Sequence, residues 1–300
     1  PGPGEVLVRV KAAGLNFADL LMIKGQYQEK PALPFAPGLE IAGAIERLGP
    51  DVDGFAPGQR VMATVAHGGF AELAVARAGD LVAVPDGVDD VIAAGFAIAY
   101  GTAYGSLQWA TSLEAGETLV VHGAAGGVGL ATVECGKALG ATVIGTARGQ
   151  ERLDVVKAHG ADHVIDTRSE DIRERIKALT SGKGADVVFD PIGGDVFDAS
   201  LRSLAWGGRL LVIGFASGRV QQIPANILLV KNVSAIGFYW GSYRKHDPAL
   251  VQASFETLLA WASEGLIKPH VSMTLELANF RDALAALEAR KSTGKIVLTI

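Results

Sequence analysis

TLVVHGAAGGVG, residues 118–129, joins a short apolar run to a turn with four glycines. A strand that enters a glycine-rich turn and opens a helix is the context in which a dinucleotide-binding fingerprint is meaningful. The glycines let the backbone approach a pyrophosphate, while the helix N-terminus supplies N–H donors and the positive end of its dipole. Ala124 replaces the first glycine of G-x-G-x-x-G, so the match is imperfect. We predict a cofactor-binding turn; the alternative is a glycine-rich turn that binds nothing.

Strand and helix patterns alternate beyond this stretch. Apolar strand patterns, separated by helical ones, lie at 142–146, 163–165, 186–189 and 209–215. Such alternation is typical of βαβ units and a parallel sheet. A further strand is predicted over 233–239, helices over 248–264 and 279–291, and a terminal strand over 295–300. We expect a doubly wound α/β domain over 99–240.

The first hundred residues follow a different pattern. Val6, Val8 and Val10 occupy alternate positions, which predicts a half-buried strand. Short strand patterns continue to residue 84 and are punctuated by Pro-Gly pairs. We expect a β-rich domain over 1–98, to which the C-terminal part, 241–300, returns.

Composition narrows the classes of function. The 300 residues include 27 Lys and Arg against 32 Asp and Glu, and 49% are hydrophobic. This length and apolar content allow about two well-packed domains. A nucleic-acid partner calls for a basic face, and a net charge of −5 argues against one. Cys135 is the only cysteine, which excludes an internal disulfide framework and a Cys-rich structural zinc site.

Residues 91–113 form a stretch of 23 positions without a charge, a length that suits a bilayer span. Gly, Thr, Ser and Gln dilute this stretch and no Lys or Arg cluster flanks it, so we predict a buried helix of a soluble domain instead. Residues 1–11 lack the apolar region of a secretory signal peptide. We expect a cytoplasmic protein without a membrane segment.

The end of the second parallel strand distinguishes the two nicotinamide cofactors. NAD sites place Asp or Glu about 20 residues after the glycine turn to hold the ribose hydroxyls, and Ala147 occupies that place. Arg148 follows, and Arg152 lies in the first turn of the next helix, where a cation opposes the helix dipole unless it meets an anion. The 2′-phosphate of NADP is such an anion, and guanidinium groups bind phosphate bidentately. We predict NADPH over NADH; the alternative is two solvated surface arginines.

Several segments together carry a resemblance to a known family. They are residues 16–19 (NFAD), 33–40 (LPFAPGLE), 124–129 (AAGGVG) and 294–298 (GKIVL). Over essentially its whole length the chain resembles the zinc-independent quinone oxidoreductases of the medium-chain dehydrogenase/reductase superfamily. The resemblance implies a GroES-like β-barrel domain plus a Rossmann domain, with the active site in the cleft between them. It also implies a homodimer in which the strand over 233–239 pairs with its copy.

Two departures from the zinc-dependent alcohol dehydrogenases of that superfamily bear on the chemistry. Those enzymes carry a Cys ahead of the Asp in the first segment and a His in a Gly-His-Glu triplet. This chain has Asn16-Phe17-Ala18 before Asp19, with no Cys among them, and Leu39 in place of that His beside Glu40. A catalytic zinc therefore lacks two of its usual ligands, and we predict no metal. A quinone or a conjugated enone spreads added charge over oxygen without a Lewis acid, so we expect NADPH to reduce such a π-system.

The resemblance implies roles for individual residues. Asn16 matches the active-site asparagine near nicotinamide and substrate, Tyr27 a tyrosine of the substrate pocket, and Thr102 a position near the nicotinamide ring. The expected cofactor contacts are Asn16, Thr102, Ala125, Gly126, Gly127, Val128, Arg148, Arg152, Thr167, Phe215, Phe238, Tyr239 and Arg290. Thr167 replaces a 2′-phosphate tyrosine of some members, and we expect Arg148 to compensate. The alternatives are that Asn16 caps a turn and that Tyr27 packs a loop.

Three hypotheses of function stay open. The first is NADPH-dependent reduction of quinones by hydride or electron transfer. The second is reduction of the carbon–carbon double bond of a 2-alkenal, an enone or acryloyl-CoA; a CoA ester needs cations, for which Arg244 and Lys245 are the candidates. The third is a low-turnover NADPH-binding structural or RNA-binding protein. Family members usually begin earlier, with a strand hairpin, so we expect this sequence to be truncated at its N-terminus.

Overall fold

A computed structural model describes all 300 residues, Pro1–Ile300, and the chain divides into two units. The first unit comprises Pro1–Ala99, Arg244–Leu259 and Pro269–Ile300, and the second comprises Tyr100–Tyr243 and Ala260–Lys268. Residues 260–268 thus pack with the second unit, although the sequence analysis grouped all of 241–300 with the first.

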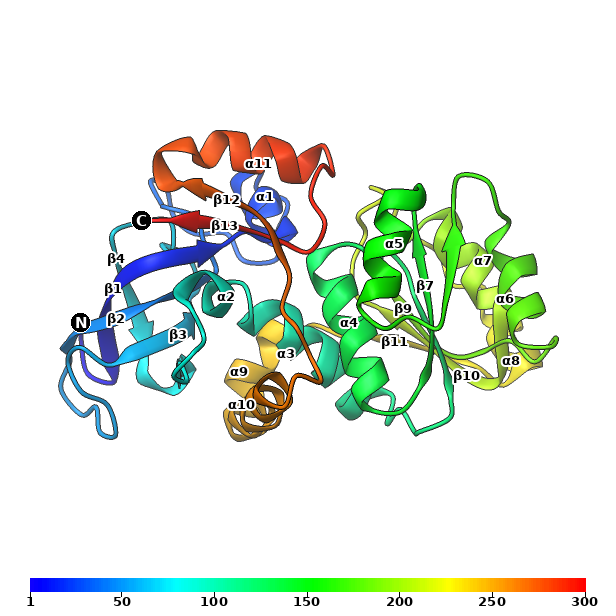
Figure 1. The fold of residues 1–300 in the computed structure, drawn as a ribbon, viewed down its shortest axis with the longest axis horizontal. Coiled ribbons are helices and arrows are strands. Elements are labelled where there is room, and N and C mark those ends of the chain that lie inside the picture. Colours follow the sequence, from blue (N-terminus) through cyan, green and yellow to red (C-terminus); the bar gives the residue numbers. More distant parts are fainter. The chain divides into compact units, whose positions relative to one another are not determined.

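The first unit is built on a seven-stranded sheet with the order β12-β13-β1-β2-β3-β5, in which β4 also pairs with β1. The strands are β1 (Glu5–Gly14), β2 (Glu40–Leu48), β3 (Arg60–Thr64), β4 (Leu73–Arg77), β5 (Leu81–Ala83), β12 (Val271–Glu276) and β13 (Lys295–Thr299). Val6, Val8 and Val10 on alternate positions of β1 enter the core, as the sequence predicts. The C-terminal β13 lies antiparallel beside the N-terminal β1 (Figure 1).

Six helices contain residues of this unit. They are α1 (Phe17–Ile23), α2 (Asp90–Ala94), α3 (Ala97–Gly105), α9 (Trp240–His246), α10 (Pro248–Ser263) and α11 (Phe280–Glu288), with 3-10 turns at Ala78–Asp80 and Leu277–Asn279. Three of these helices, α3, α9 and α10, contain residues of both units.

The second unit contains a six-stranded parallel sheet with the order β11-β10-β9-β6-β7-β8. Its strands are β6 (Thr118–Val121), β7 (Thr142–Ala147), β8 (His163–Asp166), β9 (Ala185–Asp190), β10 (Leu204–Val212) and β11 (Ser234–Gly237). Its further helices are α4 (Gly127–Ala138), α5 (Gln150–Ala158), α6 (Ile172–Leu179), α7 (Asp195–Ser203) and α8 (Ala225–Lys231). The strand order reverses between β6 and β9, as in doubly wound dinucleotide-binding folds. The predicted doubly wound parallel sheet is confirmed.

Several boundaries differ from the prediction. Strand β10 begins at Leu204, directly after α7, and ends at Val212, before the predicted end at 215. Helix α8 was not predicted, and β11 ends at Gly237. The uncharged stretch 91–113 contains most of α2, all of α3 and a π-helix at Ser106–Ala110. None of the helices has the length and apolar character that crossing a membrane requires.

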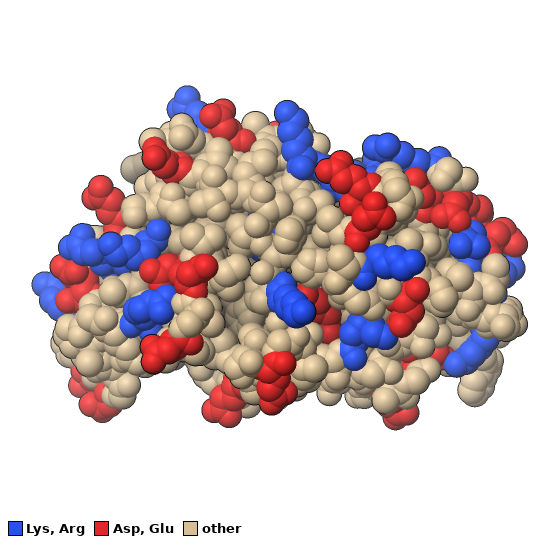
Figure 2. Space-filling view, in the orientation of Figure 1, with Lys and Arg blue, Asp and Glu red and all other residues tan.

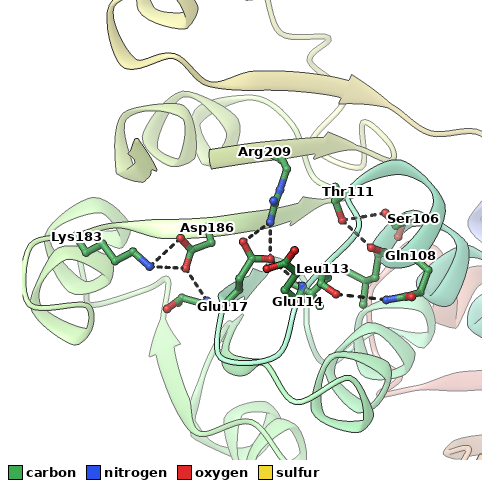
Figure 3. A network of polar contacts seen from close by, with 11 residues as sticks. Ser106, Gln108, Thr111, Leu113, Glu114, Glu117, Lys183, Asp186 and Arg209 are labelled. Atoms are coloured by element: carbon green, nitrogen blue, oxygen red, sulfur yellow. Dashed lines mark hydrogen bonds and ion pairs between the residues drawn. The ribbon is translucent and has the colours of Figure 1, made fainter. Parts of the chain in front are cut away.

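Side chains tie three parallel strands together near the start of β6 (Figure 3). Arg209 of β10 donates to both carboxylate oxygens of Glu117, at 2.6 and 2.7 Å. Asp186 of β9 accepts from the N–H of Thr118 at 2.8 Å and from Lys183 Nζ at 3.0 Å. These contacts fix the entry to β6 at the end opposite the glycine turn.

Asp19 of α1 is a fully buried carboxylic acid in the first unit. Its Oδ2 accepts from the N–H of Asn16 at 2.8 Å and its Oδ1 from the N–H of Gly38 at 3.1 Å, which joins the start of α1 to the loop before β2. Burial raises the pKa of Asp19 to about 7, although the Asn16 N–H and the charge of Lys295 favour the ionised form.

Asp80 is a contrasting carboxylate in the same unit. It accepts from Arg244 Nη2 at 2.7 Å and from Arg77 Nε at 2.7 Å. Burial by itself raises the pKa of Asp80, but the hydrogen bonds from Arg244 and Arg77 bring it below its usual value. Arg244 also donates to Thr64 O at 3.1 Å, so its guanidinium is committed to this contact.

We expect Asp19→Asn to change the pH dependence of stability. The native pKa near 7 lies above the unfolded value of about 3.9. The contribution of Asp19 is therefore fully present below the unfolded pKa and is lost as the pH rises through 7. The difference in unfolding free energy between wild type and Asp19→Asn, measured by urea denaturation, should be smaller at pH 8 than at pH 5 by about 2–3 kcal/mol.

Asp80→Asn is the matched control. Because the pKa of Asp80 is lowered, its contribution is present above the unfolded pKa and is lost only in more acidic solution. The wild-type-minus-Asp80→Asn difference should be equal at pH 5 and pH 8. If the Asp19→Asn difference is equally flat, Asp19 is ionised throughout this range and the expectation is wrong.

Candidate functional site

A buried ion pair lies beside Asn16 in the first unit. Lys295, at the start of β13, donates through Nζ to Glu40 Oε1 at 2.6 Å, to Asn16 Oδ1 at 2.8 Å and to Leu15 O at 2.8 Å. The Lys295 and Glu40 side chains are only 8% and 1% exposed. An ammonium group has three N–H donors, and each one here has an acceptor. This satisfaction offsets the large cost of removing two charges from water.

Close backbone contacts bring these side chains together. A Cβ atom at Gly14 would lie 2.6 Å from Glu40 Oε1, so glycine at this position leaves room for the carboxylate. The second oxygen, Glu40 Oε2, accepts from the N–H of Ile98 at the start of α3, at 3.0 Å. The N–H of Leu15 donates to Ile296 O at 2.9 Å, which sets β13 beside the end of β1. Residues from four separate segments therefore meet at one carboxylate.

Asn16 is the partly exposed member of this cluster. Its Nδ2 donates to Glu40 Oε1 at 2.9 Å and lies 3.4 Å from Gly14 O. Asn16 is also the N-cap residue of α1, which agrees with the turn-capping alternative. Its side-chain amide is nevertheless directed at the ion pair. The sequence analysis named Asn16 as a candidate site residue, but it did not predict that Lys295 and Glu40 are its partners.

The glycine turn of the second unit has the backbone geometry that its sequence predicts. Gly123 has a φ of 59°, a left-handed conformation that favours glycine. A Cβ atom at Gly129 would lie 2.3 Å from Gly123 O, so a side chain there would displace the turn. Gly126 is the N-cap residue of α4 and its N–H donates to Gly123 O at 2.9 Å. The first N–H groups of α4, from Gly127 onward, have no acceptor within the helix and form a potential anion site.

The surroundings of Ala124 explain how the turn accommodates alanine in place of the first glycine of the fingerprint. Its N–H donates to Thr146 O at 2.9 Å and its methyl group is fully buried. A Cβ atom at Gly145 of β7 would lie 3.2 Å from the Ala124 methyl. Glycine on the neighbouring strand thus provides the space that Ala124 needs.

Three arginines surround the ends of β7 and β8. Arg148 is exposed directly after β7, and Arg152 is half-buried in the first turn of α5. Arg168 follows β8, and its Nη1 would lie 3.1 Å from a Cβ atom at Gly149, so its guanidinium group covers that glycine. Thr167 lies between the strand and Arg168 and is hydrogen-bonded through its N–H to Ala147 O at 3.0 Å.

The Asp166 carboxylate links the backbone of the two loops that carry Arg148 and Arg168. Its Oδ1 accepts from the N–H groups of Arg168 and Gly149, each at 3.0 Å. These two hydrogen bonds, first that from Arg168, hold the pKa of Asp166 below its usual value. The sequence analysis missed Arg168; its position directly after β8, the strand that pairs with β7, was the available signal.

His122 is buried at the end of β6 and makes two local hydrogen bonds. Its Nδ1 lies 2.9 Å from Thr146 Oγ1 and its Nε2 lies 2.6 Å from Ser200 Oγ. Ser200 donates its own proton to Val196 O, so its oxygen accepts from a protonated Nε2 of the ring. Burial lowers the pKa of His122, which agrees with a neutral structural histidine.

The remaining predicted residues are divided between the units. Tyr27 lies half-buried in the loop after α1, and Arg290 follows α11 with a φ of 54°. In the second unit, Thr102 lies half-buried in α3, whereas Phe215, Phe238 and Tyr239 follow the carboxyl ends of β10 and β11. Carboxyl ends of parallel strands share one edge of a sheet, the edge that also carries the glycine turn.

Phe238 differs from its aromatic neighbours in exposure. It is 6% exposed, and its ring packs against Tyr243 and Trp109 with centroid distances of 5.3 and 6.2 Å. Phe215 and Tyr239 are 41% and 37% exposed. A packing role for Phe238 is thus evident from the structure.

Comparison with known proteins covers both units. The family model described as an alcohol dehydrogenase GroES-like domain matches residues 2–86, and the one described as a zinc-binding dehydrogenase matches residues 127–264. The chain is 43% identical over 300 residues to the quinone oxidoreductase-like protein 2 homolog of Nematostella vectensis, covering 99% of this chain and 82% of that protein. It is 38% identical over 300 residues to a quinone oxidoreductase of Pseudomonas aeruginosa, covering 99% and 92%.

A solved structure agrees with these relatives. The crystal structure of Escherichia coli quinone oxidoreductase complexed with NADPH matches with a TM-score of 0.94 at 30% identity, covering 100% of this chain and 93% of that one. Together with the match over residues 2–86, it confirms the predicted combination of a GroES-like domain and a Rossmann sheet.

The residues of this chain do not fit the zinc ion that one family description implies. No group of three or more His, Cys, Asp or Glu side chains in the structure could hold a metal ion. Residues 16–18 before Asp19 include no Cys, Leu39 stands where a His would precede Glu40, and the Lys295 ammonium is hydrogen-bonded to Glu40 Oε1. The similarity over the whole length is nonetheless clear: the chain belongs to the quinone oxidoreductase family of the medium-chain dehydrogenase/reductase superfamily.

Proposed function

We propose that this chain reduces quinones with NADPH, by hydride or electron transfer and without zinc. The observation that carries the cofactor preference is the group of Arg148, Arg152 and Arg168 at the ends of β7 and β8, with Ala147 in place of an acidic residue. Three cations fit the 2′-phosphate, whereas a ribose diol requires a carboxylate. The NADPH complex of the Escherichia coli relative supports the same cofactor.

The residues would act by binding and orienting. NADPH supplies the reducing equivalents when it is bound. The backbone at Ala125, Gly126, Gly127 and Val128 would hold the pyrophosphate at the start of α4. We propose further that the cofactor is contacted by Asn16, Thr102, Thr167, Phe215, Phe238, Tyr239 and Arg290, and the substrate by Tyr27. We also propose that 99–240 binds the cofactor and that 1–98 with 241–300 forms the catalytic part.

Asn16 would act on the acceptor. A quinone oxygen gains negative charge as the ring is reduced, and an amide N–H can donate to it. Because the charge is delocalised, a neutral donor suffices and water can deliver the proton. Zinc-independence follows in this proposal from the absence of Cys in residues 16–18, from Leu39 in place of His, and from the Lys295–Glu40 pair.

Two observations bear on the CoA-ester and RNA-binding hypotheses. Arg244, one of the two cations considered for a CoA ester, is held by Asp80 and Thr64 O. Basic and acidic side chains alternate over the face drawn in Figure 2, without the continuous basic stripe that nucleic acid favours. Neither a CoA thioester nor RNA is therefore the preferred partner.

The acceptor is tested by following NADPH oxidation with a benzoquinone, an aliphatic enone and acryloyl-CoA in parallel, each repeated with NADH. We expect turnover with the quinone and a preference for NADPH. Turnover with only the enone or the thioester would replace quinone reduction by double-bond reduction. No turnover with any of them, despite NADPH binding, would favour the low-turnover binding protein.

The cofactor preference is tested at the arginines. Arg148→Ala with Arg152→Ala, and separately Arg168→Ala, should raise the Michaelis constant for NADPH by about 10-fold or more and leave that for NADH nearly unchanged, because hydrogen bonds to a charged group are lost. Arg202→Ala, an exposed arginine at the C-terminal end of α7, is the control. Equal effects on both cofactors would remove the arginines from the 2′-phosphate site.

We also propose a homodimer formed through β11. This strand is the outermost strand at one side of the parallel sheet, and an open edge can pair with its copy across a two-fold axis. Leu229 and Val230, in the helix just before it, are 78% and 77% exposed. Exposed apolar residues just before this strand in the sequence support an interface on this side of the sheet.

Lysines on that edge should separate the subunits. Ala235→Lys with Ile236→Lys is expected to give the monomer mass in light scattering, because like charges would face each other across the axis. His163→Lys with Val164→Lys, on the outer strand β8 at the other side of the sheet, is the matched control and should leave the dimer mass unchanged. A dimer that survives the β11 substitutions would refute this pairing.

A further inference from the structure

We propose that Lys295 is a positioning residue for the reaction: with Glu40 it fixes the side-chain amide of Asn16 in one orientation, which keeps an Nδ2 N–H available to the acceptor oxygen. This inference rests on the proposed function, in which Asn16 meets the acceptor. Lys295 itself is too deeply buried for that contact, with a side chain 8% exposed.

The two charged partners leave the amide no choice of orientation. An ammonium group only donates hydrogen bonds and a carboxylate only accepts them. Asn16 Oδ1 lies 2.8 Å from Lys295 Nζ, and Asn16 Nδ2 lies 2.9 Å from Glu40 Oε1. Exchanging the oxygen and nitrogen by rotation of the amide would bring N–H against the ammonium and oxygen against the carboxylate. Both contacts would become repulsive.

The fixed orientation leaves one donor only weakly engaged. One N–H of Nδ2 is taken by Glu40, and the other is 3.4 Å from Gly14 O, beyond the usual length of a strong N–H···O bond. Asn16 is partly exposed, whereas Lys295 and Glu40 are buried. An ammonium on Oδ1 also polarises the amide and strengthens its N–H groups as donors. The arrangement therefore presents a donor of the kind that a developing oxyanion requires.

The backbone of Asn16 has its own anchor. Its N–H donates to Asp19 Oδ2 at 2.8 Å, which fixes the start of α1. Only the side-chain torsions remain, and the Lys295–Glu40 pair determines them. Stability alone does not require the pair, because apolar groups of similar volume often replace a buried ion pair without loss.

The test removes both charges together, so that neither is left buried alone. Lys295→Met with Glu40→Gln is compared with Lys24→Met with Glu288→Gln, an exposed ion pair of the same unit. In the first variant we expect kcat with the quinone to fall about 10- to 100-fold, as for misplaced or missing donors. The NADPH dissociation constant, measured by fluorescence, should stay unchanged, and the exposed-pair control should keep both values.

A double-mutant cycle separates positioning from a general structural effect. In an Asn16→Ala background the Lys295→Met/Glu40→Gln change should have almost no effect on kcat, because the amide that it positions is already gone. An equal loss in both backgrounds, or a kcat near wild type in a folded Lys295→Met/Glu40→Gln variant, would overturn the proposal.

A measurement without turnover keeps the proposal independent of the acceptor. In nitrogen-15 NMR spectra the Asn16 side-chain amide is identified by its absence in Asn16→Ala. We expect one sharp pair of signals in wild type and in Lys295→Arg, which retains the cation, and broadened or shifted signals in Lys295→Met/Glu40→Gln. Unchanged signals in the last variant would refute the positioning role. A wild type that keeps the sharp pair but reduces no acceptor would refute the proposed function alone.

Discussion

The carboxylate of Glu40 is almost entirely withdrawn from water, and the first unit supplies the groups that satisfy it. The ammonium of Lys295 comes from the last strand, the amide of Asn16 from the start of α1, and a backbone N–H from Ile98 in α3. Gly14 contributes by having no side chain, because a Cβ atom there would meet the carboxylate. A buried charge tolerates little displacement of its partners, so strand register, helix start and loop position are coupled.

The second unit depends instead on backbone shape. The turn after β6 approaches α4 so closely that Gly129 has no space for a side chain, and Gly123 adopts a left-handed conformation. At the next two strand ends, the carboxylate of Asp166 gathers the N–H groups of Gly149 and Arg168. The carboxylate at this edge thus holds the backbone of the two loops in place.

Local patterns were sufficient to predict much of this protein. The strand, glycine turn and helix around residues 118–129 lie together in sequence, as do Ala147 and Arg148, and the alternation of strands and helices predicted the parallel sheet. Contacts between distant segments were not accessible: Lys295 and Glu40 are 255 positions apart, and Arg168 joins the other arginines only because β8 pairs with β7. The early start of β10 was hidden because α7 runs into it with no separating loop, while Gly207 and Gly208 lie inside the strand.

The position of β13 between β12 and β1 has a consequence for synthesis on the ribosome. The sheet of the first unit stays incomplete until residues 295–299 have emerged from the ribosome. Until then, Glu40 lacks the Lys295 ammonium as its partner. Most of the second unit, 100–243, is continuous in sequence and has all its strands available earlier. We expect the parallel sheet to be native-like on the nascent chain while the first hundred residues are still incompletely folded. During this time a chaperone could protect their unpaired strands from aggregation.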